Sequence, residues 1–94
     1  MTTTLSGAIH TIFPEEKYGQ FIQRVIWLKQ INVKYPLIWE IQFWHDDGSA
    51  MLNKFKNGDV VSVDIEVRGK MWTPRNSNQE KVINILRGVN IKKA

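Results

Sequence analysis

Four tryptophans are the residues of this chain whose chemistry is most informative, because 94 residues provide little core in which to bury them. An indole side chain buries roughly 150–250 Å² when it is packed inside a protein. A domain of this length has a thin core, so we expect some of the four to lie on the surface or at an interface. They are Trp27, Trp39, Trp44 and Trp72. An exposed indole offers a flat apolar face on which another planar group can stack.

Positive charge is concentrated in the last third of the chain. Thirteen Lys and Arg residues stand against nine Asp and Glu residues, which gives a formal net charge of +4. Residues 67–94 contain seven basic residues and one acidic residue, whereas residues 37–66 contain two basic and six acidic residues. The basic segment favours a polyanionic partner such as a nucleic acid. The acidic middle third favours a surface that contacts protein, because it would repel a phosphate backbone.

Signals for catalysis and for metal binding are weak. Cysteine is absent, which excludes disulfides, thiol nucleophiles and cysteine-bound zinc. His10 and His45 are the two histidines, and neither has the spacing of a metal-ligand pair. The aspartates that follow His45 are explained by helix capping, and no phosphate-binding loop, dinucleotide-binding or nucleophile-elbow motif occurs. We therefore predict no enzymatic activity, no metal site and no cofactor.

One domain spanning residues 1–94 is expected, since the chain shows no internal repeat, low-complexity tract or linker. No apolar run approaches the length of a membrane-spanning helix, and the first ten residues lack the basic start of a secretory signal. These features predict a cytoplasmic protein.

Alternation of apolar and polar residues predicts an all-β fold with five strands. The clearest strand is 60–67, and the others are 5–13, 21–33, 37–45 and one within 82–91. Apolar positions change parity near His10, which predicts a β-bulge in the first strand. The last segment also fits helical spacing, but its β-branched residues and Gly88 favour a strand with a kink. Gly69 permits a bend after the fourth strand.

A short helix over residues 49–55 is predicted between the third and fourth strands. Met51, Leu52 and Phe55 form an apolar stripe at helical spacing, and Asp47 or Ser49 can cap the N-terminus. Five strands would leave exposed edges in an open sheet, and closure into a barrel removes them. This element order predicts a five-stranded OB-fold barrel. An SH3-like barrel is the alternative, but it does not usually place a helix at this point.

Side-chain alternation within the strands predicts which tryptophans face outward. On the second strand, inward Ile26 and Leu28 would place Trp27 and Lys29 on the outer face. The opposite parity is almost as well supported and would bury Trp27. On the third strand, alternation places Trp44 outward, on the same face. The inward residues of that strand are then Trp39, Ile41 and Phe43.

Residues 57–63, Asn-Gly-Asp-Val-Val-Ser-Val, resemble the GD-x-V-x-V run of OB-fold single-stranded-DNA-binding proteins of phage and bacterial type. The segment continues to Gly69, Lys70, Met71 and Trp72, which is similar to the G-(R/K)-x-W ending of the same hairpin in that family. Residues 5–9 resemble the opening strand of small members, and Tyr35-Pro36 before the third strand is another shared feature. The resemblance covers most of the chain.

This resemblance implies a non-catalytic protein that binds single-stranded DNA during replication or recombination. In such proteins cations contact the phosphates and aromatic rings stack on the bases, mostly from the second and third strands and the neighbouring loops. The residues of this chain that would do so are Trp27, Lys29, Trp44, Arg68, Lys70, Trp72 and Arg75.

The chain departs from the family at its end, where residues 90–94 are basic rather than an acidic partner-recruiting tail. This departure favours a phage or mobile-element variant. The alternative functions are a protein-interaction or oligomerisation module, with the tryptophans buried against another chain, and an RNA-binding module. A homodimer or higher oligomer is also expected, because one OB barrel offers only a short footprint for a nucleic acid strand.

Overall fold

Six strands and one short helix make up the described part of the chain, which comprises residues 2–73 and 79–94 of the computed structural model. The strands are β1 (Thr2–Ile12), β2 (Glu16–Tyr18), β3 (Phe21–Lys29), β4 (Ile38–Trp44), β5 (Val60–Trp72) and β6 (Lys81–Lys93). The helix α1 spans His45–Met51 and continues into a 3₁₀ helix, η1 (Leu52–Lys54).

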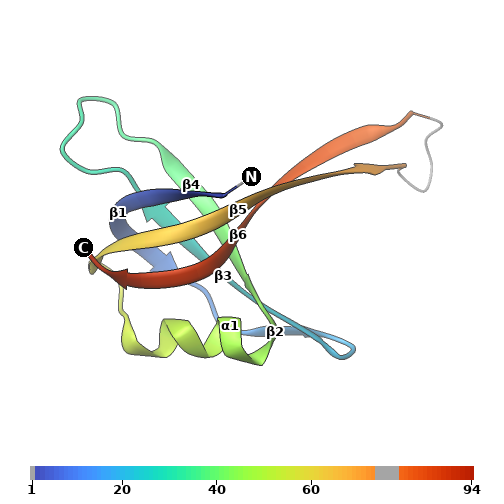
Figure 1. Cartoon of the computed structure of the whole chain (residues 1–94), viewed down its shortest axis with the longest axis horizontal. Coiled ribbons are helices and arrows are strands. Elements are labelled where there is room, and N and C mark those ends of the chain that lie inside the picture. The colour runs from blue at the N-terminus through green and yellow to red at the C-terminus, as the bar shows by residue number, and fades with distance from the viewer. Residues whose placement is uncertain (1, 74–78) are drawn as a thin grey trace.

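Five of the strands close into a barrel. Around the sheet they follow the order β1, β5, β6, β4 and β3, and β1 also pairs with β3, which closes the ring. Strands β4 and β6 are parallel, and the other neighbouring pairs are antiparallel. Helix α1 lies at one end of this barrel, between β4 and β5 in the chain (Figure 1). The predicted OB-fold barrel with a helix after its third strand is therefore confirmed.

The inward residues of the strands fill the barrel, together with Leu52 of η1. Ile26 and Leu28 are fully buried and Trp27 lies on the outer face, so the predicted parity of this strand is confirmed. Trp39, which was predicted to face inward, is only partly buried and packs against the core from the second position of β4. The buried apolar residues are Ile9, Ile26, Leu28, Ile41, Phe43, Leu52, Val61, Val63, Ile65 and Ile91.

Strand β1 pairs with two neighbouring strands, so it must change direction between the two pairings. It pairs with β5 through Thr2–Ala8 and with β3 from Ala8 onward, and its register shifts between Ile9 and Thr11. This shift confirms the predicted bulge near His10. Gly7 lies at the crossing, where an added Cβ would be 2.3 Å from the carbonyl oxygen of Lys29. Only glycine allows the two strands to approach this closely.

The helix differs from the prediction in position and in capping. It begins at His45, four residues before the predicted start, because a positive φ of 65° at His45 turns the chain directly from strand into helix. Trp44 precedes the helix, and its side chain makes no capping hydrogen bond. The predicted caps are therefore wrong: Asp47 accepts from the N–H of Gly48 within the first turn, and Ser49 is buried inside the helix. In the described ranges, no helix is long and apolar enough to cross a membrane.

Strands β5 and β6 extend beyond the barrel as a two-stranded hairpin, here called the arm (residues 67–72 and 81–86). Strand β1 pairs with β5 only as far as Glu66, so residues beyond it have no barrel neighbour on that side. Val67 continues the apolar alternation of Val61, Val63 and Ile65, but it is 37% exposed for this reason. Figure 1 shows the arm projecting away from the body of the barrel.

The remaining strand boundaries also differ from the sequence pattern. Strand β3 ends at Lys29 rather than residue 33, and β5 continues through Gly69 without interruption. The short strand β2 pairs with the start of β3, and the sequence pattern predicted no strand over residues 16–18. The last segment is a strand, not a helix, and its register with β5 shifts next to Gly88, as the predicted kink requires.

Candidate functional site

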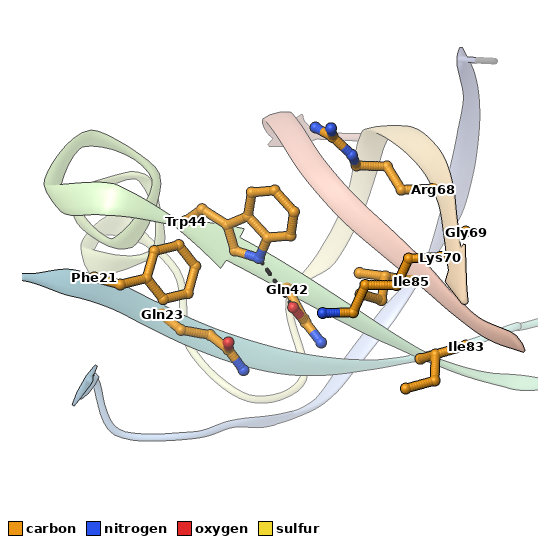
Figure 2. Close-up of a pocket in the computed structure, with 9 residues that line it drawn as sticks. All are labelled: Phe21, Gln23, Gln42, Trp44, Arg68, Gly69, Lys70, Ile83 and Ile85. Carbon is orange, nitrogen blue, oxygen red and sulfur yellow. Dashed lines mark hydrogen bonds between the residues drawn. The ribbon is translucent and has the colours of Figure 1, made fainter. Parts of the chain in front are cut away.

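A groove of about 550 Å³ lies between the outer face of β3 and β4 and the base of the arm (Figure 2). We call it the Trp44 groove. Its lining combines aromatic and aliphatic surface with amide and cationic groups. The residues that line it are Phe21, Gln23, Gln42, Trp44, Arg68, Gly69, Lys70, Ile83 and Ile85.

Strand register explains why these side chains meet. Residues paired across antiparallel strands point to the same face, so Gln23 and Trp44 project outward together from β3 and β4. On the arm, Lys70 is paired with Ile83, and Arg68 is paired with Ile85 two residues further along. The arm therefore presents one alternating set of side chains to the outer face of the barrel.

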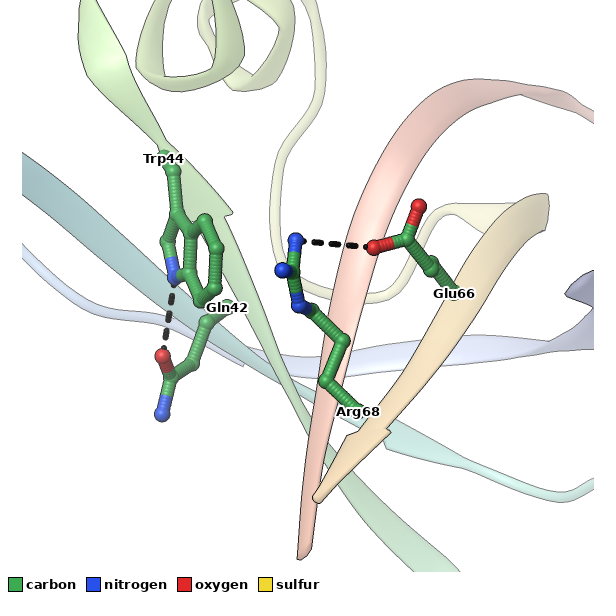
Figure 3. Close-up of polar contacts among 4 residues, drawn as sticks. All are labelled: Gln42, Trp44, Glu66 and Arg68. Atoms are coloured by element: carbon green, nitrogen blue, oxygen red, sulfur yellow. Dashed lines mark hydrogen bonds and ion pairs between the residues drawn. The ribbon is translucent and has the colours of Figure 1, made fainter. Parts of the chain in front are cut away.

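The indole of Trp44 is held in place from several sides. Its Nε1–H donates a hydrogen bond of 2.9 Å to Oε1 of Gln42 (Figure 3). The Phe21 ring meets it edge to face, with 5.8 Å between ring centroids. Two guanidinium groups lie near its ring centroid, that of Arg87 at 4.8 Å and that of Arg68 at 5.4 Å. This arrangement places a flat apolar ring directly beside two cations.

The charges near Trp44 are mostly positive. Arg68 Nη1 lies 2.9 Å from Glu66 Oε1, and both side chains are substantially exposed to solvent. The Nε atom of Arg87 is buried and has no hydrogen-bond partner in the described part of the chain. Lys70 adds a third cation to the lining. Because an exposed ion pair contributes little to stability, Arg68 can exchange Glu66 for another anion at small cost.

Trp27 lies on the same outer face but at the opposite end. Trp27 pairs with Glu40, whereas Trp44 pairs with Gln23, which precedes Trp27 by four residues on β3, a separation of about 13 Å at strand spacing. The Phe13 ring covers one side of Trp27, with ring centroids 4.8 Å apart, and leaves the indole 37% exposed. Lys29 is exposed at the end of β3, beyond Trp27.

Two carboxylates, Glu16 and Glu40, line the shallow pocket that contains this second indole, and among the described residues no cation does. Trp27 Nε1 donates to Glu40 Oε2 at 3.4 Å. Glu16 borders the same surface and accepts a hydrogen bond from the hydroxyl of Tyr18. That hydrogen bond, together with the negative charge of Glu16, raises the pKa of Tyr18. The two ends of the outer face therefore differ in charge, and the end near Trp44 is the more suitable for an anion.

The structure thus brings together only some of the predicted site residues. Trp44, Arg68 and Lys70 share one groove. Trp72 lies at the far end of the arm, on the same face as Lys70, and is 47% exposed. Arg75 lies outside the described residues.

Sequence reasoning missed several residues that surround Trp44. Gln23 and Gln42 have the same parity as Trp27 and Trp44, so strand alternation alone could have identified them. Arg87 was not predictable in this way, because it reaches Trp44 through the parallel pairing of β6 with β4. Across residues 2–73 and 79–94, no three acidic or histidine side chains gather as metal ligands would.

Comparison with known proteins identifies both a family and a fold. A family model described as a domain of unknown function (DUF3127) matches residues 4–92. A search of curated proteins found no match. Among solved structures, the mitochondrial single-stranded DNA binding protein Rim1 from S. cerevisiae is similar, with a TM-score of 0.77 and 12% identity over 99% of this chain and 93% of that chain. The small single-stranded DNA-binding protein from Streptomyces coelicolor has a TM-score of 0.62 and 10% identity, over 100% and 94% of the two chains. These similarities show that the OB-fold is shared.

Proposed function

The chain belongs to the DUF3127 family, and we propose that it binds single-stranded DNA without catalysing a reaction. The observation that carries this proposal is the Trp44 groove, in which an indole face lies beside the guanidinium groups of Arg68 and Arg87. A single strand needs both cations for its phosphates and flat faces for its unstacked bases. The similar structures are described as single-stranded DNA-binding proteins, which also supports the proposal.

Binding would begin with electrostatic attraction and finish with base stacking. Arg68, Lys70 and Arg87 attract the phosphates, and a base then stacks on the exposed part of Trp44. Because every base has a flat face, stacking tolerates any sequence. Protection of unwound strands in replication or recombination is the role that such binding would serve.

Further aromatic and cationic side chains lie on the surface on either side of the groove. Trp72 is paired with Lys81 at the end of the arm, so a second indole and a further cation lie on the face that already carries Lys70. At the other end, the outer face leads to Trp27 and Lys29. We propose that the strand runs along this surface, with its strongest contacts at the Trp44 groove.

A salt series of fluorescence titrations with oligo-dT tests the proposal. We expect tryptophan fluorescence to fall as oligo-dT is added at low salt. Three phosphate contacts should give a slope of log K against log salt of about −2, since each contact to a single strand contributes about −0.7. Absence of quenching at low salt would contradict the proposal. Parallel titrations with oligo-rU and duplex DNA measure the preference for DNA over RNA and for single strands.

A protein-interaction module is the second candidate function. Met71 and Val82 form a cross-strand pair on the face of the arm that points away from Lys70, and they are 69% and 68% exposed. Sedimentation with and without oligonucleotide separates the two candidates. Self-association that hides this face, with no affinity for oligonucleotides, would favour the second.

Neutralising Glu66 tests the electrostatic part of the proposal. Glu66→Gln removes the carboxylate that competes with phosphate for Arg68, so we expect the affinity for oligo-dT to rise by about two- to fivefold. The matched control is Glu40→Gln, which removes one negative charge at the Trp27 end and should have a smaller effect. An unchanged or lower affinity of the Glu66→Gln protein would show that Arg68 does not contact a phosphate of the bound strand.

A further inference from the structure

The proposed path of the single strand has two ends, and these differ in charge. One is the end of the arm, where Trp72 is paired with Lys81 and both side chains are exposed. The other is the shallow pocket around Trp27, here called the Trp27 pocket, with a volume of about 360 Å³. Figure 1 shows the arm projecting away from the barrel, whose strands β3 and β4 carry this pocket. Contact between the two ends therefore requires two copies of the chain.

Two carboxylates in the Trp27 pocket have no cationic partner. Glu16 accepts a hydrogen bond from the Tyr18 hydroxyl, and Glu40 accepts one from Trp27 Nε1. Within the described ranges, the one ion pair lies on β5 and involves neither carboxylate. A carboxylate has lone pairs for about four hydrogen bonds, so both can still accept from a cation. The Trp27 pocket therefore presents two negative charges beside an exposed indole.

The end of the arm presents an indole beside a cation. Trp72 is 47% exposed, and Lys81 pairs with no carboxylate in the part of the chain that the structure describes. Glu80, the one acidic residue of segment 67–94, lies directly before β6. Lys70 and Lys81 together leave this face of the arm positive. Its charge is therefore complementary to that of the Trp27 pocket.

The direction of a nucleic acid strand brings these two ends together. A strand runs from a 5′ end to a 3′ end, and an asymmetric surface binds it in one direction. Copies bound side by side on one strand therefore have the same orientation. The arm of one copy then faces the Trp27 pocket of the next. Such a contact joins two different surfaces, so it can be repeated along the strand.

We propose that the end of the arm docks in the Trp27 pocket of a second copy bound next to it on the same strand. Lys81 of one copy lies against Glu16 and Glu40 of its neighbour, and Trp72 covers the exposed part of the neighbouring Trp27. This inference rests on the proposed function, because the strand aligns the two copies. It goes beyond that function by assigning a contact between copies to named residues. The contact also neutralises carboxylates that would otherwise repel the strand.

Titrations with two lengths of labelled oligo-dT test the contact, one that holds a single copy and one that holds two. Binding stoichiometry over a series of lengths identifies both. We expect the second copy to bind the longer oligonucleotide about three- to tenfold more tightly than one copy binds the shorter, because each exposed ion pair contributes up to about 1 kcal/mol. We call this ratio the neighbour factor. High salt should lower it, since salt screens exposed charges.

Removing the carboxylates separates the contact from binding itself. In the double variant Glu16→Gln, Glu40→Gln, the neighbour factor should fall below about twofold. Affinity for the shorter oligonucleotide should not fall, because no cation or indole is lost. The matched control is the double variant Asp46→Asn, Asp47→Asn, which removes two exposed carboxylates from α1 and should keep the wild-type factor.

Exchanging the charges of the two ends tests the pairing directly. Glu40→Lys and Lys81→Glu each place like charges at the contact, so each should abolish the neighbour factor. The chain that carries both substitutions again places opposite charges there. It should regain a neighbour factor above about twofold.

The outcomes separate this inference from the proposed function. Wild-type binding to both lengths with no gain for the second copy overturns the inference alone. A gain that persists unchanged in the Glu16→Gln, Glu40→Gln protein also overturns it, since the copies would then meet through another surface. Failure of the wild-type protein to bind either length overturns the proposed function together with the inference.

Discussion

Replacing Trp44 by alanine is expected to weaken oligo-dT binding by about 10- to 100-fold. Stacking of one base on an aromatic side chain contributes about 1–3 kcal/mol, and the alanine protein loses that contribution entirely. Trp44 also lies against the guanidinium groups of Arg68 and Arg87, so its removal frees two cations from a defined position. Fluorescence anisotropy with labelled oligo-dT measures the loss, because that signal does not depend on the tryptophan removed.

Three comparisons show whether the loss of affinity in Trp44→Ala is caused by the loss of stacking at this position. Trp44→Phe keeps a flat ring but loses the Nε1–H, so its affinity should lie between those of the wild-type and alanine proteins. Trp27→Ala removes an indole surrounded by carboxylates and should cost less than Trp44→Ala. Thermal unfolding should show that the Trp44→Ala barrel remains folded, with a loss of about 1–2 kcal/mol. A full loss in Trp27→Ala with normal binding by Trp44→Ala would place the binding surface at the other end of the face.

Local patterns in the sequence predicted those parts of the fold that depend on one strand at a time. Successive side chains of a strand point to opposite faces, so alternation around Ile26 and Leu28 left two possible parities, and the one that places Trp27 outside the barrel is correct. The change of parity near His10 indicated the bulge, since a bulge is itself an interruption of that alternation. These features need no knowledge of which strands are neighbours.

Features that depend on where a pairing ends were not predictable from the pattern. Val67 continues the alternation of Val61, Val63 and Ile65, yet it is exposed because β1 has already ended. The arm begins at this point, and it is the arm that carries Lys70 to the groove. The apolar alternation of β5 reaches Val67, beyond the last residue that pairs with β1, so the pattern does not mark where the barrel ends.

The surroundings of each indole were likewise set by distant residues. Trp27 and Trp44 look equivalent on a single outer face, but their neighbours come from different elements. Arg68 and Arg87, from the arm and β6, approach Trp44, whereas Glu40 of β4 meets Trp27. Sequence alternation could therefore indicate which rings face outward, but not which ring would lie beside the cationic side chains.

Replacing Gly88 by alanine is expected to lower the free energy of unfolding by about 1–3 kcal/mol, the cost of forcing extra volume into a packed core. A Cβ at this position would lie 2.4 Å from the nearest atom of the Phe43 ring, and Phe43 is fully buried. Each kcal/mol should lower the melting temperature by roughly 4–8 °C in a domain of this size. Thermal and urea unfolding followed by circular dichroism measure the effect.

A double-mutant cycle tests whether the loss of stability in Gly88→Ala arises from contact with Phe43. Phe43→Leu alone should destabilise the barrel by leaving a cavity, but the same substitution in Gly88→Ala provides room for the added methyl group. The two losses should therefore sum to more than the loss in the double variant. Gly69→Ala is the control: its Cβ would meet the side-chain oxygen of Asn84 at 3.3 Å on the exposed arm, so stability should change by less than about 1 kcal/mol. Strict additivity at Gly88 and Phe43 would contradict a direct clash. It would mean that β6 relieves the added volume by moving its backbone.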